Sequence, residues 1–120
     1  MVDLPDSEKE KQMNVEAFFI QAAKDLKLCE LVSKGGGTHL VEPYMIYLSA
    51  TGQRLFHYYQ IRGHSKSGQP TGWKNPKVDS FARATIRDET FSPRRGYNPF
   101  NYEIFPTVYF SIPTADGRQR

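Results

Sequence analysis

Basic, aromatic and hydroxyl-bearing residues cluster around one loop of the sequence. The basic members are Arg62, Lys66, Lys74 and Arg83, and the others are His57, Tyr58, His64 and Ser65. Guanidinium and ammonium groups pair with phosphates while aromatic faces stack on bases, which is how proteins hold single-stranded nucleic acid and nucleotides. Backbone N–H groups near Gly63 and Gly68 add an anion nest. We therefore expect these residues to bind an anionic ligand.

The positive charge of the chain is concentrated in the same region. The net charge is +3, but residues 54–95 carry nine lysines and arginines against three carboxylates. A positive face attracts nucleic acid, nucleotides, phosphates or an acidic protein. Basic residues scattered over a solvated surface would give the same count, so charge alone leaves both interpretations open.

The histidines, His39, His57 and His64, do not follow the spacings that metal sites need. His64 with Ser65, or His57 and His64 with Asp79, can be assembled into a nucleophile and base. Neighbours in a flexible loop rarely hold such a pair in register, however. We expect a protein that is not an enzyme and that has no metal site and no cofactor.

A strand, a polar loop and a second strand, residues 54–79, must position the cluster. Residues 55–61 are rich in aromatic and branched side chains, which suit a half-buried strand. The loop, residues 63–72, contains three glycines and a proline and should lie on the surface. The chain re-enters the fold at Trp73. Because strand residues alternate between faces, either Tyr58 or Tyr59 should point inward, and Trp73 favours the core.

Residues 14–91 are predicted to form one helix and about five strands. The helix, residues 15–28 after an N-cap at Asn14, has an apolar stripe that includes Phe18 and Phe19. The strands are predicted at 29–33, 38–50, 53–63, 73–78 and 82–87, with Pro43 forcing a bend or bulge that breaks the second. This pattern favours a mainly β fold, a small SH3-like or Sm-like barrel preceded by one N-terminal helix. A two-layer α+β arrangement is the other candidate.

The two ends of the chain differ in composition from this domain. Residues 1–13 are charged and lack apolar spacing, so we expect disorder there, and also at 114–120. Residues 92–113 form an aromatic C-terminal extension that is also rich in proline. So many exposed rings would mark an interface. The extension should therefore pack on its own barrel or on a second copy, with a last strand at 107–112, and a homodimerisation or protein interaction module is the alternative function.

The remaining composition is that of one cytoplasmic domain. Cys29 is the only cysteine, so no internal disulfide forms, and a reducing compartment is expected. Its apolar neighbours favour a structural role over a nucleophilic one. The first residues lack the apolar region of a signal peptide, and no apolar run approaches the about 20 residues that span a bilayer.

Several motifs, in order along residues 15–91, resemble the WYL domain of bacterial regulators. They are VEPY (Val41–Tyr44), YYQIRGHSKSGQPTGWK (Tyr58–Lys74), KNPKVDSF (Lys74–Phe81) and RDETF (Arg87–Phe91). The second motif is closest to the small free-standing form of the family. The naming Trp-Tyr-Leu triplet is replaced here by Phe56-His57-Tyr58 or by a neighbouring frame, and the regulators' winged-helix segment is not found ahead of these motifs. The resemblance implies a non-catalytic barrel that senses a ligand, often nucleic acid or a nucleotide, in a regulatory or defence-associated role.

Overall fold

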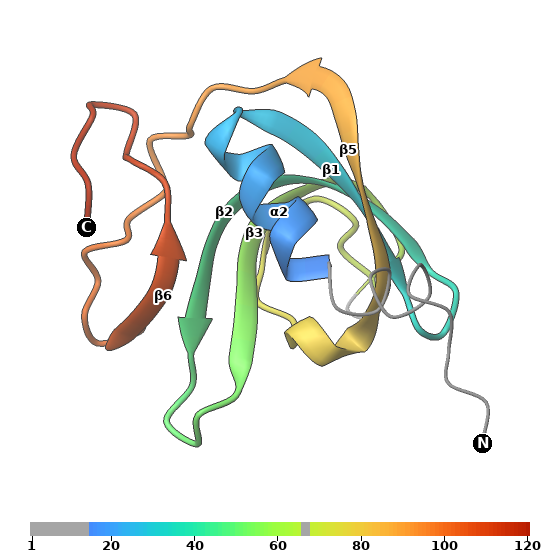
Figure 1. The fold of residues 1–120 in the computed structure, drawn as a ribbon, viewed down its shortest axis with the longest axis horizontal. Helices are drawn as coiled ribbons and strands as arrows, with labels where there is room; N and C mark the ends of the chain where they lie inside the picture. The colour runs from blue at the N-terminus through green and yellow to red at the C-terminus, as the bar shows by residue number, and fades with distance from the viewer. Residues whose placement is uncertain (1–14, 66–67) are drawn as a thin grey trace, which may run out of the picture.

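A computed structural model describes residues 15–65 and 68–120 of the chain (Figure 1). In chain order the elements are α2 (Val15–Lys24), β1 (Lys27–Ser33), β2 (Thr38–Leu48), β3 (Arg54–Gly63), β4 (Gly72–Lys74), the 3-10 helix η1 (Val78–Ser80), β5 (Phe81–Thr90) and β6 (Thr107–Ser111). The expected disorder of residues 1–13, the N-cap at Asn14 and the site residue Lys66 all fall outside these described residues. Within the described ranges, no helix has the length and apolar character that crossing a lipid bilayer requires.

All six of these strands belong to one antiparallel sheet. The order is β4-β3-β2-β1-β5, and β6 pairs with the second half of β2, beyond the point where β1 leaves it. The mainly β prediction with one N-terminal helix is therefore confirmed. The closed barrel is not confirmed, because β4 and β5 end the strand order without pairing with each other in the described part of the chain.

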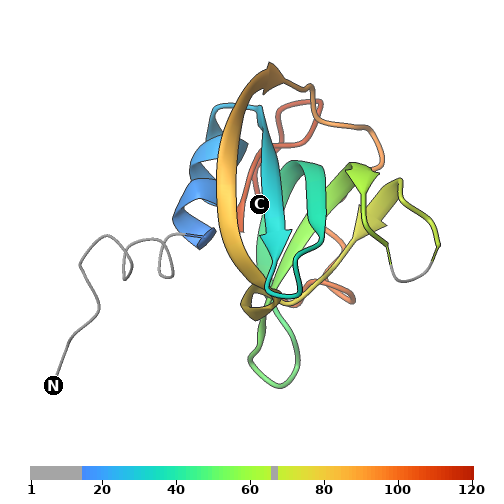
Figure 2. The ribbon, with the colours of Figure 1, turned by 90° about the vertical axis from the view of Figure 1, so that its right-hand side faces the viewer.

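Helix α2 lies against one face of the curved sheet (Figures 1 and 2). Phe19 is fully buried and stacks on Phe56 of β3 with 4.1 Å between ring centroids, but Phe18 is 42% exposed. The sequence-based placement of Phe18 in the core is therefore wrong. The helix also ends at Lys24 instead of residue 28, because Leu26 adopts a left-handed φ of 53° and its N–H bonds to the carbonyl of Ala23.

The sheet is covered on both faces, as the burial of consecutive residues in β2 shows. From His39 to Tyr47 every residue of β2 is buried, with no alternation. Val41 and Ile46 contribute to the cluster under α2, whereas Tyr44 and Met45 belong to a second cluster. A register shift against β3 between Pro43 and Met45 marks the expected bulge, but β2 continues through it as one strand.

The second cluster is completed by the C-terminal extension, which packs on the sheet of its own chain. Tyr97, Phe105 and Ile112 are almost fully buried, and β6 confirms the predicted last strand. Residues 114–120 differ from the expected disorder. Thr114 bonds to the backbone of Arg118, and the Arg120 guanidinium donates to the carbonyl oxygens of Pro99 and Phe105.

Candidate ligand-binding site

A cavity of about 660 Å³ lies beside the start of the 63–72 loop, at His64 and Ser65, and we call it the loop cavity. The β1–β2 hairpin, β3, the loop itself and the segment from Lys74 to Phe81 contribute its walls. Figure 2 shows α2 and the described ends of the 63–72 loop on opposite sides of the view. Tyr58 and Phe81 of the cavity wall belong to the same apolar cluster as Phe19 of α2, so the cavity lies on the face of the sheet that the helix covers in part. The side chain of Gln60 ties two described loop residues to β3. The Gln60 side-chain amide donates to the carbonyl oxygens of His64, at 3.1 Å, and Pro70, at 2.9 Å.

Four of the predicted site residues meet in the loop cavity: Tyr58, His64, Ser65 and Lys74. The Lys74 ammonium is tied to the loop, because it donates to the Gln69 carbonyl oxygen at 2.7 Å and to the Ser65 hydroxyl at 3.3 Å. Tyr58 is only 2% exposed, and burial raises the pKa of its phenol well above the usual value. Its hydroxyl makes no hydrogen bond with the residues that the structure describes. Among these residues no buried side-chain polar atom lacks a partner, so the Tyr58 hydroxyl is open to the cavity.

His57 lies on the opposite face of the sheet from Tyr58, because neighbouring strand residues alternate. Its ring stacks on Trp73 at 4.8 Å with an interplanar angle of 8°, and its Nδ1 lies 2.8 Å from the Asn75 side-chain oxygen. Burial lowers the pKa of His57, and the hydrogen bond to Asn75 offsets this in part. The structure thus places His57 in the core under the C-terminal extension, away from the loop cavity.

Arg62 and Arg83 are exposed and do not line the loop cavity. Lys66 lies in the loop but outside the described residues. The rings that were expected to stack on bases are also covered. Trp73 packs among His57, Tyr44, Tyr59 and Tyr97, and the face of Tyr59 carries the Arg94 guanidinium at 3.7 Å. At this site the structure presents a cavity, with no flat platform of exposed rings.

The fold brings together in the same cavity three residues whose contact was not expected from the sequence: Ser33, His39 and Gln60. The Ser33 hydroxyl lies 2.8 Å from His39 Nε2, and His39 Nδ1 lies 2.9 Å from Gln60 Oε1. His39 is 8% exposed and Gln60 is 1% exposed. Ser33 and His39 flank the glycine turn at 35–37, and that spacing was a signal that the two could meet across a hairpin. Gln60 carried no comparable signal, because its position depends on the pairing of β2 with β3.

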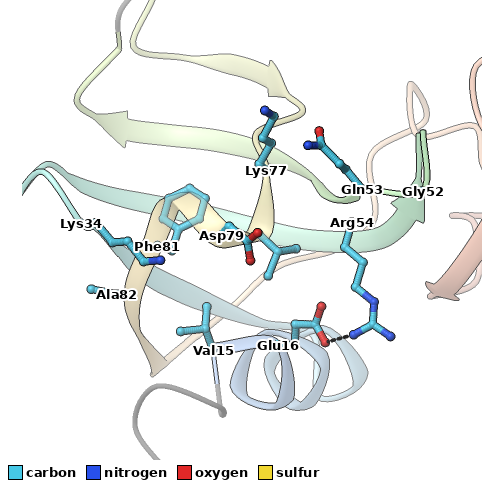
Figure 3. A pocket seen from close by; sticks show the side chains of 11 residues that line it. Val15, Glu16, Lys34, Gly52, Gln53, Arg54, Lys77, Asp79, Phe81 and Ala82 are labelled. Carbon is cyan, nitrogen blue, oxygen red and sulfur yellow. Dashed lines mark hydrogen bonds and ion pairs between the residues drawn. The ribbon is translucent and has the colours of Figure 1, made fainter. Parts of the chain in front are cut away.

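The electrostatics of the loop cavity favour negative charge. Lys74, His39 and His64 line it, and no described aspartate or glutamate does. A second cavity, of about 880 Å³, lies near the start of α2 and is also basic, but it is partly neutralised. Figure 3 shows the Glu16 and Asp79 carboxylates in its wall, with Glu16 paired to Arg54 at 2.8 Å.

The described residues support neither a nucleophilic cysteine nor a metal site. Cys29 is fully buried, and burial raises the pKa of its thiol to about 12, so it is not a nucleophile at neutral pH. In residues 15–65 and 68–120, no group of three histidine, cysteine, aspartate or glutamate side chains is placed to hold a metal ion.

Searches against protein-family models, curated proteins and solved structures found no match to the chain. The resemblance to the WYL domain therefore stays a prediction, and function must be argued from the residues of the loop cavity.

Proposed function

We propose that the protein binds a small anionic ligand, a nucleotide or another phosphorylated metabolite, in the loop cavity. The observation that carries the proposal is a cavity wall without described carboxylates that holds the half-buried Lys74 ammonium, together with the imidazole rings of His39 and His64. An anion entering the cavity meets the Lys74 ammonium, and no described carboxylate competes for it.

The size and polarity of the cavity support the same ligand class. Sites for small molecules measure about 300–1,000 Å³, and a few convergent polar groups fix the ligand's orientation. The loop cavity, at about 660 Å³, falls in this range. The Tyr58 hydroxyl adds a donor that no described residue uses. The shape favours a small ligand over a strand of nucleic acid, because the rings expected to stack on bases are packed into the protein.

The order of the strands supports a proposal about the fold. The strand order, in which β5 returns to pair with β1 after a β1-to-β4 meander, is the arrangement that wraps a small sheet toward a barrel. We retain the SH3-like or Sm-like barrel of the WYL type as a proposal, together with a regulatory or defence-associated role. The expectation that the ligand is bound without being turned over also remains a prediction.

This proposal can be tested by thermal-shift and calorimetric titrations. The ligands are inorganic phosphate, nucleoside mono- and diphosphates and short labelled oligonucleotides. We expect a mononucleotide or phosphate to raise the melting temperature, and Lys74→Met to reduce affinity about tenfold or more, since a charge-assisted hydrogen bond contributes about 1.5–3 kcal/mol. Arg83→Gln removes the same charge outside the cavity and should leave affinity within twofold. Equal losses in both variants would contradict a cavity site.

The oligonucleotide arm separates the two ligand classes. If a strand binds along the surface, its affinity falls with the logarithm of salt concentration, with a slope of about −0.7 per phosphate contact. Arg62 and Arg83 would then matter as much as Lys74. Tight oligonucleotide binding with that pattern would replace the small-ligand proposal with the strand-binding hypothesis.

The C-terminal extension supports a second candidate function, self-association. Its rings at Tyr97 and Phe105 are buried in the chain, but Tyr102, Ile104 and Tyr109 are 60%, 57% and 48% exposed. Large exposed apolar side chains on one segment are typical of protein interfaces. Light scattering on the full chain and on Ile104→Lys should show a dimer that dissociates in the variant. A wild-type monomer at high protein concentration would remove this candidate.

A further inference from the structure

The hydrogen bonds among Ser33, His39 and Gln60 have the connectivity of a nucleophile, a base and a residue that orients the base. Ser33 Oγ lies 2.8 Å from His39 Nε2, and His39 Nδ1 lies 2.9 Å from Gln60 Oε1. The residues come from β1, β2 and β3, so paired strands hold all three in register. All three also line the loop cavity, so a bound molecule can reach them.

The surrounding hydrogen bonds select the tautomer of a neutral His39 ring. The Gln60 Nε2 amide donates to two backbone carbonyl oxygens, those of His64 and Pro70. Its Oε1 therefore faces His39 and can only accept, so the proton of the neutral imidazole sits on Nδ1. Nε2 is left with a lone pair, and it accepts the hydrogen bond of the Ser33 hydroxyl. This is the tautomer in which a histidine can take a proton from a serine.

We propose that Ser33 is a nucleophile activated by His39, with Gln60 as the positioning residue, and that the loop cavity hydrolyses small carboxylic esters. Ser33 Oγ forms a bond to the ester carbonyl carbon as its proton moves to His39 Nε2. The tetrahedral intermediate then expels the alcohol, which takes that proton. Water attacks the acylated Ser33, gives a proton to His39, and the acid leaves as the serine recovers its proton.

The side chains that line the loop cavity indicate which esters it would accept. Lys74 and Tyr58 line the same space and are hydrogen-bond donors, which favours an ester that carries a negative group or whose oxyanion these donors can stabilise. Gln60 is neutral, so it orients the imidazole without the charge that a carboxylate would supply to the imidazolium. Turnover should therefore be slow, and activated esters are the appropriate probes.

This inference departs from the sequence-based expectation of a protein without activity. That expectation weighed only pairs within the loop, such as His64 with Ser65, and did not include Ser33. The inference stands apart from the anion-binding proposal as well, since an uncharged ester tests it.

The test combines covalent labelling with hydrolysis of p-nitrophenyl acetate. A fluorophosphonate probe should label the wild-type protein, and peptide mass spectrometry should place the label on Ser33. Because this readout needs no variant, it is independent of any effect of substitution on folding. Absence of a label on Ser33, or labelling spread equally over Ser65 and Ser80, would overturn the proposal.

Matched variants assign the roles. Ser33→Ala should abolish label and turnover, and His39→Asn should slow turnover by about 100-fold or more. Ser92→Ala, which removes an exposed serine outside the loop cavity, should leave both unchanged. Gln60→Leu and Gln60→Glu both lose the amide donors to the loop carbonyl oxygens, but only Gln60→Glu keeps an oxygen for His39 Nδ1. Turnover should therefore be slower in Gln60→Leu than in Gln60→Glu, a difference that a purely structural role would not give. If Ser33→Ala hydrolyses the ester as fast as the wild type, Ser33 is not the nucleophile.

Discussion

Substitution of Arg94 by Met is predicted to weaken the attachment of the C-terminal extension to the sheet. The Arg94 guanidinium donates to both carboxylate oxygens of Glu42, at 2.9 and 3.0 Å, and the Glu42 side chain is only 7% exposed. Tyr44 completes the link, because its hydroxyl donates to Glu42 at 2.9 Å and accepts from the Arg94 backbone N–H at 3.0 Å. In Arg94→Met the carboxylate stays buried and keeps only the Tyr44 hydrogen bond among these.

The size of the effect follows from this geometry. Removing one partner of a fully buried ion pair costs about 3–5 kcal/mol. The Arg94 side chain is 45% exposed, however, so water can enter and solvate part of the charge. We therefore expect a loss of about 2 kcal/mol in the free energy of unfolding. Methionine keeps an apolar stem over the Tyr59 ring, so the loss should report mainly on the charged contact.

Urea unfolding followed by Trp73 fluorescence measures this loss. Arg95→Met, an exposed neighbour, is the matched control and should stay within about 0.5 kcal/mol of the wild type. In a Glu42→Gln background Arg94→Met should cost much less, which gives a coupling energy of about 1 kcal/mol or more. Equal effects of Arg94→Met and Arg95→Met, or additive effects with Glu42→Gln, would refute the reasoning.

Three further predictions concern stability. Burial lowers the pKa of His57, so the unfolded chain binds a proton more readily than the folded chain does. The free energy of unfolding should therefore be highest above pH 6.5, the pKa of an unperturbed histidine, and should fall as the pH drops below that value. The melting temperature of His57→Phe should depend less on pH than that of the wild type. Gly63 has a φ of +132°, and a Cβ added there would lie 2.9 Å from the Cα atom of His39 in β2. Gly63→Ala should therefore lower the free energy of unfolding in urea by at least about 2 kcal/mol. Gly68 also has a positive φ but has open space around it, so Gly68→Ala should lower it by about 1 kcal/mol. Phe19→Ala should cost about 3–5 kcal/mol in the same assay, whereas the half-exposed Phe18→Ala should cost under about 1; similar values for the two would contradict the packing of α2.

The elements were predictable where a local pattern determines them. Each strand was expected within a few residues of its position, because branched and aromatic runs between glycine turns are local signals. The end of α2 was missed, since a left-handed leucine at position 26 has no sequence signature. Near-complete burial of β2 also could not be foreseen, because it depends on the C-terminal extension returning to cover the second face.

The candidate site was predictable only in its local part. His64, Ser65 and Lys74 meet because a single loop brings them together. Arg83 was expected in the same surface, but the sheet register places it elsewhere. Arg94 was not named as a candidate residue from the sequence, and it pairs with Glu42, 52 positions away. The contact of His39 with Gln60 likewise depends on strand pairing, which composition and spacing do not reveal.

The most direct test of the central claim, that the loop cavity binds a small anion, is an amide-resolved NMR titration with a nucleoside monophosphate. If the loop cavity is the site, amide chemical shifts should change saturably at the β1–β2 turn, His64, Ser65 and Lys74 only. These changes should be lost in Lys74→Met. Shifts centred on Arg62 and Arg83, or on the cavity beside Glu16 and Arg54, would contradict it.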